Sequence, residues 1–275
     1  MTSVAGLMRA SALPALETRI LLEHVLGWSR TELITRDDEE LAAESVDRFD
    51  ALAHRRAAGE PIAQLVGTRE FFGLEFEVTP DVLIPRPETE LLVEIALEQM
   101  AGIEAPRVLD LGTGSGAIAV AIAFSRDDAQ VWAVDRSAEA LAVTARNALK
   151  LLGMDRPLNL LQSDWTSALN PALRFEVIVS NPPYIAQDDP HLSEGDLRFE
   201  PRTALTDEAD GLAAIRTIVQ TAPFFLATGG SLWLEHGYDQ AADVRALLMA
   251  RGFSGVRSER DLAGIERVSG GFFTA

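Results

Sequence analysis

The feature that most restricts the fold is the regular alternation of short apolar runs with longer amphipathic stretches after Arg107. The apolar runs have the length of buried strands, and the stretches between them repeat apolar residues at three- and four-residue spacing, as helices do. Strands that alternate with helices favour a mostly parallel sheet covered on both faces, the doubly wound α/β (Rossmann-like) class. The expected strands are RVLDL, QVWAVD, LNLLQSD, EVIVSNPP and SLWLEHG, followed by two closing segments, GVRSERD and ERVSGGFFTA.

The chain ahead of this region has a helical pattern from about Ala15 to Leu65, with Ser29 and Asp38 as candidate helix caps. The composition then changes at REFFGLEFEVTPDVLIPRPETE, where aromatic and β-branched residues indicate a hairpin and three prolines exclude a helix. We therefore expect a small helical bundle over residues 1–68, a hairpin linker over 69–86 and an α/β domain over 87–275.

Charge and cysteine content exclude several classes of function. The formal net charge of −18 disfavours a sequence-independent grip on nucleic acid, because phosphate binding relies on Lys and Arg. The absence of cysteine excludes disulfides, thiolate catalysis and cysteine-ligated metal. No run approaches ~20 uninterrupted apolar residues, so we expect a soluble, cytoplasmic protein that does not enter a membrane. The four histidines lack metal-ligand spacing, and we predict no metal site.

A glycine-rich turn follows the first strand of the α/β region, in the sequence from Asp110 to Gly116. Glycines allow a backbone to approach a ligand closely, although such a turn by itself is also typical of an ordinary strand-to-helix connection. The next strand ends at Asp135, roughly 20 residues after Gly116, where an acidic side chain can accept the hydroxyl hydrogens of a ribose. Together these features predict a nucleotide-like ligand more strongly than either does separately.

The spacing within the turn distinguishes between two such ligands. The dinucleotide fingerprint is G-x-G-x-x-G around a pyrophosphate, whereas this turn has G-x-G-x-G directly after Asp110. A carboxylate at that position would repel a pyrophosphate but suits a ligand with an amino group and a sulfonium. The turn therefore favours S-adenosylmethionine as the cofactor.

The tetrapeptide Asn181-Pro182-Pro183-Tyr184 follows the fourth strand directly. Neither proline has an N–H group, so the turn presents carbonyl acceptors without competing donors. The Asn181 amide and the Pro182 carbonyl can accept both hydrogens of a substrate –NH2 group, and Tyr184 can lie against its planar face. Because the first and fourth strands of a doubly wound sheet are neighbours, both motifs should face one crevice. The pattern predicts methyl transfer to a planar amide-type nitrogen.

Several further side chains are weaker candidates. Asp164 could contact an adenine amino group and Trp165 could pack on the base, although a buried Trp beside a solvated Asp explains them equally well. The segment from Arg86 to Glu90, which includes Glu88 and Thr89, could border the pocket or cap the helix that follows it. The segment Glu200-Pro201-Arg202 could brace the loop after Tyr184.

The chain resembles the HemK/PrmC family, the peptide chain release factor glutamine methyltransferases. The matching segments are GEPIAQLVGTREFFG (59–73), IPRPETE (84–90), VLDLGTGSGAIA (108–119), the strand ending at Asp135, SDW (163–165), SNPPYI (180–185), FEPRTAL (199–205), LEHG (234–237) and DLAGIERV (261–268). The resemblance implies a seven-stranded class I methyltransferase domain after a helical domain that helps to dock the release factor. It also implies methylation of the side-chain amide nitrogen of the glutamine in the Gly-Gly-Gln motif of class I peptide chain release factors, giving N5-methylglutamine.

Carried over to this sequence, the family's cofactor-binding positions are Gly112, Thr113, Gly114, Ser115, Gly116, Asp135, Trp165 and Asn181. Its substrate-binding positions are Asn181, Pro182, Pro183 and Tyr184, of which Asn181, Pro182 and Tyr184 are the catalytic candidates. Three other readings stay open. They are a glutamine methyltransferase of a ribosomal protein, an adenine-N6 nucleic-acid methyltransferase, which the acidic charge disfavours, and a non-catalytic sensor of S-adenosylmethionine, which would need no clamp for an acceptor. We expect a monomer.

Overall fold

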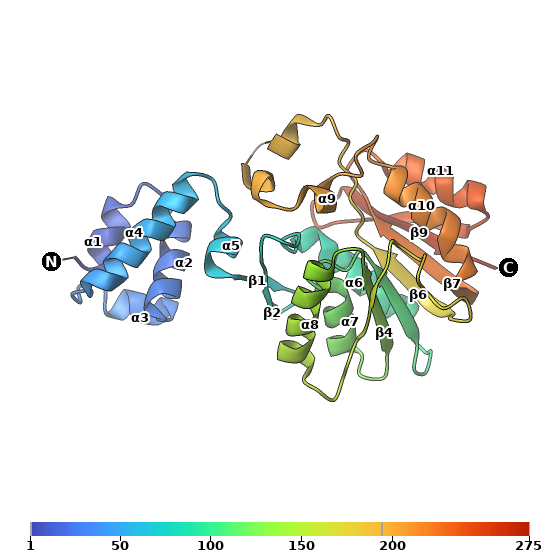
Figure 1. Ribbon diagram of the computed structural model, residues 1–275, viewed down its shortest axis with the longest axis horizontal. Helices are drawn as coiled ribbons and strands as arrows, with labels where there is room; N and C mark the ends of the chain where they lie inside the picture. The colour runs from blue at the N-terminus through green and yellow to red at the C-terminus, as the bar shows by residue number, and fades with distance from the viewer. Residues whose placement is uncertain (1, 194, 275) are drawn as a thin grey trace. The chain divides into compact units, whose positions relative to one another are not determined.

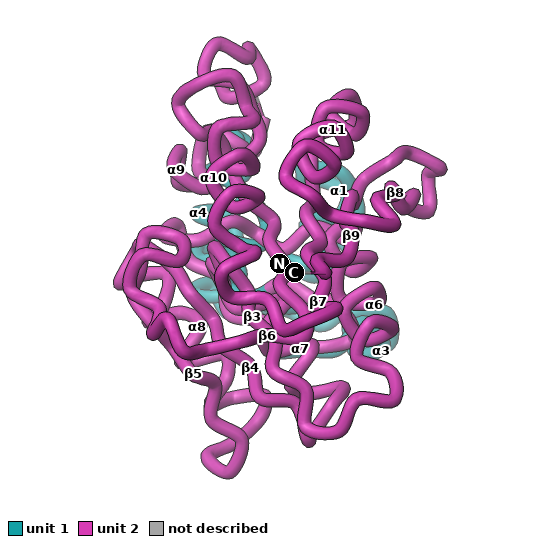
Figure 2. The backbone as a smooth tube through the Cα atoms, turned by 90° about the vertical axis from the view of Figure 1, so that its right-hand side faces the viewer, with its two compact units in different colours: residues 1–68 teal, residues 69–275 magenta. Residues whose placement is uncertain are grey.

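The computed structural model describes residues 2–193 and 195–274 and divides into two compact units, residues 1–68 and 69–275 (Figure 2). The smaller unit is helical, and its core is built around Leu21, Leu22 and Phe49. Its helices are α1 (Val4–Ala10), α2 (Ala15–Leu26), α3 (Arg30–Thr35), α4 (Ala43–Ala57) and α5 (Ile62–Val66). Ser29 caps α3 in a capping box with Glu32, as its sequence position indicated. Asp38 caps no helix, because α4 starts later, after Ala42.

The larger unit begins with a two-stranded hairpin, β1 (Thr68–Phe71) and β2 (Leu74–Glu77). The turn between the strands contains Gly73 at φ 73°, a conformation that glycine adopts without strain. A short 3-10 turn, η1 (Pro87–Thr89), then leads into α6 (Glu90–Gln99). Pro87 opens this turn, where the missing N–H of proline leaves no helical bond unmade.

A seven-stranded sheet forms the centre of the larger unit, in the order β5-β4-β3-β6-β7-β9-β8. Within this sheet β3 to β7 run parallel, whereas β9 is antiparallel to both β7 and β8. The strands are β3 (Arg107–Leu111), β4 (Gln130–Asp135), β5 (Asn159–Gln162), β6 (Phe175–Ser180), β7 (Leu226–Glu235), β8 (Ser254–Arg260) and β9 (Glu266–Phe272). The doubly wound sheet expected from the alternating pattern is thus confirmed. Because β3 pairs with β6, the two turns that follow these strands open at the same edge of the sheet.

Helices cover both faces of this sheet (Figure 1). One core contains Val108 of β3 with residues of α6, α7 (Ala117–Ser125) and α8 (Ala138–Leu152). The other contains Leu109 of the same strand with residues of α10 (Ala213–Thr221) and α11 (Ala241–Arg251). Neighbouring strand residues enter opposite cores because successive side chains of a strand point to opposite faces. The strands are therefore apolar on both sides, which explains their near-continuous hydrophobic sequence.

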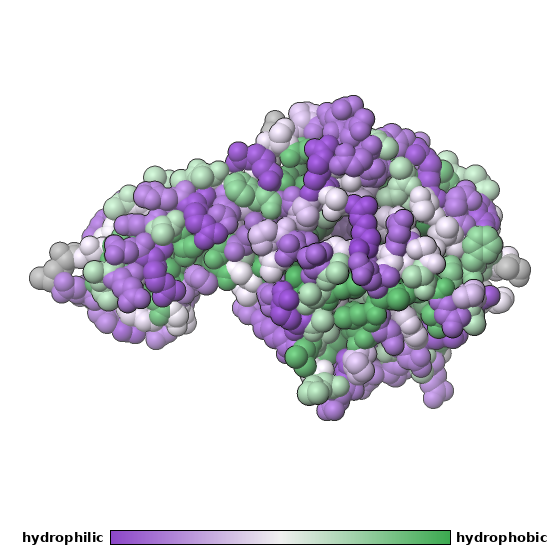
Figure 3. Space-filling view, in the orientation of Figure 1, coloured by the Kyte–Doolittle hydropathy of each residue, from purple (hydrophilic) through white to green (hydrophobic). Residues whose placement is uncertain are grey.

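The remaining elements are short and lie in the connections. They are η2 (Pro190–Ser193), η3 (Gly195–Phe199), α9 (Arg202–Leu205) and η4 (Ala222–Phe224). Hydrophilic side chains predominate on the face drawn in Figure 3, with a hydrophobic band across the lower half of the larger unit. Within the part of the chain that the structure describes, no helix is both long and apolar enough to cross a membrane.

Candidate functional site

A cavity lies at the edge of the sheet where β3, β4 and β6 end. Its empty volume is about 990 Å³, counting the part open to solvent. The predicted site residues that line it are Gly112, Thr113, Gly114, Ser115, Asp135, Trp165, Asn181 and Pro183. The fold thus gathers residues that are far apart in the sequence around one concave space, where small-molecule ligands usually bind. Gly116, Pro182 and Tyr184 are not among the lining residues.

The glycine-rich turn bonds mainly to its own surroundings. The N–H groups of Gly112 and Thr113 both donate to the Val134 carbonyl, at 2.8 and 2.9 Å. Gly116 caps α7 with φ 82°, and a Cβ atom there would lie 2.7 Å from Cγ2 of Thr144. Any other residue at position 116 would therefore be strained and would collide with α8. At its glycines the turn therefore presents backbone atoms to the cavity, and the N–H groups of Gly112 and Thr113 are already hydrogen-bonded within the protein.

Asp135 lies at the end of β4 and holds the turn in place. Its Oδ2 accepts a hydrogen bond from the N–H of Gly114 at 2.9 Å, and its Oδ1 accepts one from Ser137 at 2.9 Å. Each carboxylate oxygen has a further lone pair, so both can still accept hydroxyl hydrogens from a ligand in the cavity. Trp165 is half-buried nearby, and its ring would lie 3.4 Å from a Cβ built at Gly112. A Cβ at position 112 would thus meet the indole at ordinary contact distance, and it is the φ of 75° at this position that favours glycine.

Asp110 is fully buried and does not line the cavity. Its Oδ2 accepts a hydrogen bond from the Thr113 hydroxyl at 2.6 Å, and its Oδ1 has no hydrogen-bond partner among the described residues. Burial raises the pKa of this carboxyl to about 7, against the lowering effect of the Thr113 hydroxyl. Asp110 is thus a partly protonated group beside the turn rather than a carboxylate exposed to the ligand.

The Asn181 side chain faces the cavity from the end of β6, in contact with the 84–90 segment. Its Nδ2 donates to the Thr89 hydroxyl at 3.1 Å. Both residues line the cavity, together with Pro183. Pro182 is buried and does not line the cavity. Because Thr89 takes one hydrogen of Nδ2, the amide oxygen and the second Nδ2 hydrogen of Asn181 stay available to a ligand.

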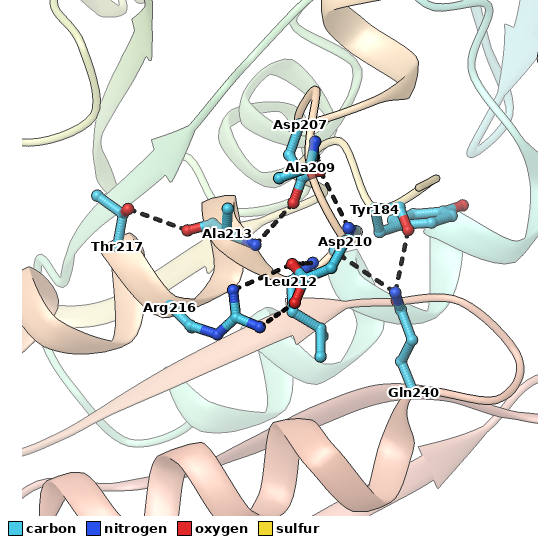
Figure 4. A network of polar contacts seen from close by, with 10 residues as sticks. Tyr184, Asp207, Ala209, Asp210, Leu212, Ala213, Arg216, Thr217 and Gln240 are labelled. Carbon is cyan, nitrogen blue, oxygen red and sulfur yellow. Dashed lines mark hydrogen bonds and ion pairs between the residues drawn. The ribbon is translucent and has the colours of Figure 1, made fainter. Parts of the chain in front are cut away.

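Tyr184 is anchored at both ends. Its hydroxyl donates to Oε1 of Glu235 at 3.3 Å, and its backbone carbonyl accepts from Nε2 of Gln240 at 3.0 Å (Figure 4). Burial is the largest cause that raises the pKa of the Tyr184 phenol, and the nearby Glu235 carboxyl raises it further. In this structure the ring packs with the core that contains α10 and α11. The tyrosine therefore fixes the path of the loop after Asn181.

Glu200 joins the segment before α6 to the segment before α9. Its carboxylate accepts a hydrogen bond from the N–H of Ile84 at 2.9 Å and forms an ion pair with Arg86. Burial raises the pKa of Glu200 above its usual range, although the adjacent Arg86 opposes this. Arg86 and Pro201 both line the cavity. The sequence marked these residues as weak candidates, and the ion pair explains why both segments border one site.

Sequence reasoning missed two contacts of the site, Glu235 and Gln240. Glu235 ends β7 and lies next to His236, within the segment LEHG, which reads as an ordinary strand end. Gln240 precedes α11 and has no sequence signal. Among residues 2–193 and 195–274, no group of three or more His, Asp or Glu side chains could hold a metal ion.

Comparison with known proteins matches both parts of the chain to described families. Residues 4–67 match the PrmC N-terminal domain, and residues 87–195 match the Methyltransferase small domain. The release factor glutamine methyltransferase of Burkholderia pseudomallei is 69% identical over 98% of this chain and 95% of its own length. The protein of the same name from Bordetella pertussis is 55% identical over 99% of this chain and 100% of its own.

A solved structure supports the fold assignment. The T. thermophilus 16S rRNA N2 G1207 methyltransferase, in complex with AdoMet and guanosine, matches with a TM-score of 0.54 at 23% identity, covering 74% of this chain and 49% of that one. At this identity the likeness concerns the fold alone. It agrees with the seven-stranded sheet.

Proposed function

Since this chain belongs to the release factor glutamine methyltransferase family, we propose that it methylates the side-chain amide nitrogen of the Gly-Gly-Gln glutamine in class I peptide chain release factors. The reaction gives N5-methylglutamine, and S-adenosylmethionine is the methyl donor. The observation that carries the proposal is the placement of Asn181 in the same cavity as the glycine-rich turn and Asp135. An acceptor amide held by Asn181 would thus lie beside a bound cofactor.

The cavity suits S-adenosylmethionine by the chemistry of its lining. The cavity is open to solvent on one side and is lined by both polar and apolar residues, as a cofactor with a ribose, a base and a charged end requires. Asp135 offers two carboxylate oxygens for ribose hydroxyls, and the Trp165 indole offers an apolar surface beside the turn. When bound, the cofactor supplies a methyl group on a positively charged sulfur. The turn from Gly112 to Ser115 lets it approach the backbone closely.

The acceptor side of the site uses hydrogen-bond acceptors because an amide nitrogen is a poor nucleophile. We infer that the Asn181 amide oxygen and the Pro182 carbonyl bind the two hydrogens of the substrate –NH2 group, which fixes the direction of the nitrogen lone pair. Oriented in this way, the nitrogen gains from proximity, and the carbonyl dipoles stabilise the positive charge that develops on it. Pro183 borders the same space, and Tyr184 holds the loop from the core side.

Partner recognition is assigned to residues 1–68. This unit contains no residue of the proposed methyl-transfer site, and it matches the PrmC N-terminal domain. We propose that it docks the release factor while the larger unit performs the chemistry. The net charge of −18 supports a protein substrate rather than nucleic acid, and the proposed working form is the monomer.

Mass spectrometry of a release factor incubated with the chain and S-adenosylmethionine tests the proposal. The expected product carries one added methyl on the Gly-Gly-Gln peptide. The Asn181→Ala variant should lose transfer by about 100-fold or more, because it removes an acceptor that acts on the reacting nitrogen. Asn170→Ala, which changes an exposed asparagine in the loop before β6, serves as the matched control.

The other outcomes select between substrates. An unmodified release factor, with cofactor binding intact, would overturn the proposal, and transfer to a glutamine of a ribosomal protein or to adenine in nucleic acid would identify the alternative. Cofactor binding without transfer to any acceptor would indicate a sensor. Full activity of Asn181→Ala would refute the role of the amide clamp.

A further inference from the structure

The side chain of Gln240 joins three backbone segments beside the acceptor motif. Its Nε2 donates to the Tyr184 carbonyl at 3.0 Å (Figure 4) and to the Gly211 carbonyl at 3.2 Å. Its Oε1 accepts from the N–H of Gly237 at 2.8 Å. These partners lie in the loops that follow β6, precede α10 and follow β7. One amide group thus connects three loops of the larger unit.

The orientation of this amide is fixed by its partners. A backbone carbonyl can only accept a hydrogen bond and a backbone N–H can only donate one, so Nε2 must face the two carbonyls while Oε1 faces Gly237. A flipped amide would place its oxygen against two carbonyl oxygens and its NH2 group against an N–H. Both hydrogens of the Gln240 amide are therefore engaged, each by a different loop.

Gln240 is itself fastened to the end of β7. Its backbone N–H donates to the Gly237 carbonyl at 3.1 Å, and Nδ1 of His236 donates to the same carbonyl at 2.9 Å. The His236 ring is fully buried, and its Nε2 hydrogen-bonds to the Ser269 hydroxyl of β9 at 2.8 Å. Because the sheet fixes Gln240 in this way, the loop that contains Tyr184 takes its position from Gln240.

The middle of the acceptor motif cannot hold itself in place. Pro182 and Pro183 have no N–H group, and the proline ring restricts φ to about −65°. The segment between Asn181 and Tyr184 is therefore a stiff link whose two ends set the direction of the Pro182 carbonyl. The pairing of β6 with β3 and β7 fixes the first end, and Gln240 holds the carbonyl at the second end.

We propose that Gln240 is a positioning residue for methyl transfer, whose side-chain amide holds the Tyr184 carbonyl and thereby aims the Pro182 carbonyl at the acceptor nitrogen. The inference rests on the proposed function, since it assumes that Pro182 binds the substrate –NH2 group. Gln240 does not line the cavity, so it acts through the backbone of Tyr184.

The test uses two substitutions that keep the length of the side chain. Gln240→Met removes the three side-chain hydrogen bonds, and Gln240→Glu replaces the donor NH2 group by an oxygen that faces two carbonyl oxygens. Gln220→Met and Gln220→Glu are the matched controls, because Gln220 is exposed on α10. Mass spectrometry gives kcat and KM for a release factor, and calorimetry gives the Kd and the stoichiometry of S-adenosylmethionine binding. The value of kcat is counted per bound cofactor, so that unfolded protein does not contribute.

Gln240→Met should lower kcat by roughly 10- to 100-fold, because a carbonyl displaced by about 1 Å no longer orients the acceptor nitrogen. Gln240→Glu should lower it further, since its carboxylate repels the carbonyl oxygens that Nε2 attracts. The KM for the release factor and the cofactor Kd should each change by less than about threefold, the pattern for an interaction that acts in the transition state. Both Gln220 variants should keep the wild-type kcat.

A double variant shows whether the effect passes through the Tyr184 carbonyl. Gly211→Ala adds a methyl group that would press on this same carbonyl oxygen. Combined with Gln240→Met, it should be no slower than the slower single variant, because both changes release one carbonyl. Multiplicative losses would mean that the two residues act separately, and they would overturn the inference.

Other results would also overturn it. A lower Tm of Gln240→Met with a wild-type kcat would show that the amide only stabilises the fold, and equal kcat losses in the Gln220 variants would remove the special role of position 240. If Gln240→Glu does not bind the cofactor, Gln240→Met and its double variant decide alone. The proposed function fails in a different way, since wild type itself would then leave the release factor unmethylated.

Discussion

Gly211 is a position at which a single added methyl group should displace the acceptor loop, which we define as residues 181–186. Its φ is +81°, and a Cβ atom there would lie 2.5 Å from the Tyr184 carbonyl oxygen and 2.9 Å from Nε2 of Gln240. The glycine cannot move away, because its N–H donates to Asp207 at 3.0 Å and its carbonyl accepts from Gln240 at 3.2 Å. Gly211→Ala must therefore displace Tyr184.

The cost has two parts. An alanine held at positive φ loses about 1–2 kcal/mol relative to glycine. Moving the Tyr184 carbonyl away also breaks its bond to Gln240 and strains the second Gln240 bond, at about 0.5–1.5 kcal/mol each. We therefore expect Gly211→Ala to lower the free energy of unfolding of the larger unit by about 2–5 kcal/mol. The accompanying shift of the acceptor loop should lower kcat by about 100-fold, with little change in cofactor Kd.

Gly264→Ala is the matched control. Gly264 has φ +79° and bonds at both its N–H and its carbonyl, but a Cβ there meets nothing within 4 Å. Only the conformational cost of about 1–2 kcal/mol should remain, and kcat should be unchanged. Thermal unfolding by circular dichroism reports stability, at roughly 2–4 °C per kcal/mol for a unit of this size. Equal Tm losses and equal kcat in the two variants would refute the contact argument.

Three further results are expected. Asp135→Ala should weaken S-adenosylmethionine binding by roughly 10- to 100-fold in calorimetry through loss of charge-assisted hydrogen bonds, and an unchanged Kd would remove Asp135 from the cofactor site. Gly116→Ala should destabilise the larger unit by about 2–4 kcal/mol in urea unfolding. Adding Thr144→Ser, which deletes the clashing methyl group, should restore about 1–2 kcal/mol. If stability does not recover, the strain arises elsewhere. Burial raises the pKa of Glu235 to about 7, from about 4.3 in an unfolded chain, so the stability due to its bound proton is present at low pH and lost as the pH rises through 7. Between pH 5 and pH 8, the free energy of unfolding of wild type should therefore fall by roughly 2–3 kcal/mol relative to that of Glu235→Gln. A difference in unfolding free energy that stays constant with pH would contradict the raised pKa.

The cofactor half of the site could be predicted from the sequence because its signals are local. The turn from Gly112 to Gly116 has positive φ angles at its three glycines, and glycine adopts such angles without strain. The residue types therefore indicate the backbone conformation directly. Asp135 follows from the end of the next strand, and the strand order of a doubly wound sheet places Asn181 at the same edge. Repeating apolar patterns and one topological rule are sufficient for these placements.

Tertiary structure altered the interpretation of Asp110. This residue precedes the turn in the sequence as a carboxylate for a cationic ligand, but the fold buries it completely and raises its pKa to about 7. For Tyr184 the fold adds partners that the sequence does not indicate, since its partly buried ring packs against the core and its hydroxyl binds Glu235, while its placement against the acceptor's planar face stays a prediction. Burial depends on which parts of the chain pack around a residue, and the residues adjacent to it in the sequence do not specify that packing.

The sequence by itself determined the α/β class, the helical character of the first residues, the glycine-rich turn after β3 and the position of the 181–184 motif at the same edge of the sheet, because each depends on residue spacing within one element or on a fixed strand order. Only the tertiary structure decided which distant side chains hold that motif, namely Glu235 from β7 and Gln240 before α11, and it also paired Glu200 with Arg86, which lines the cavity. These contacts join segments separated by about 50 residues or more, and no periodicity links their partners. Their pairing is fixed by the packing of the sheet and its helices, which brings the loops together at one edge.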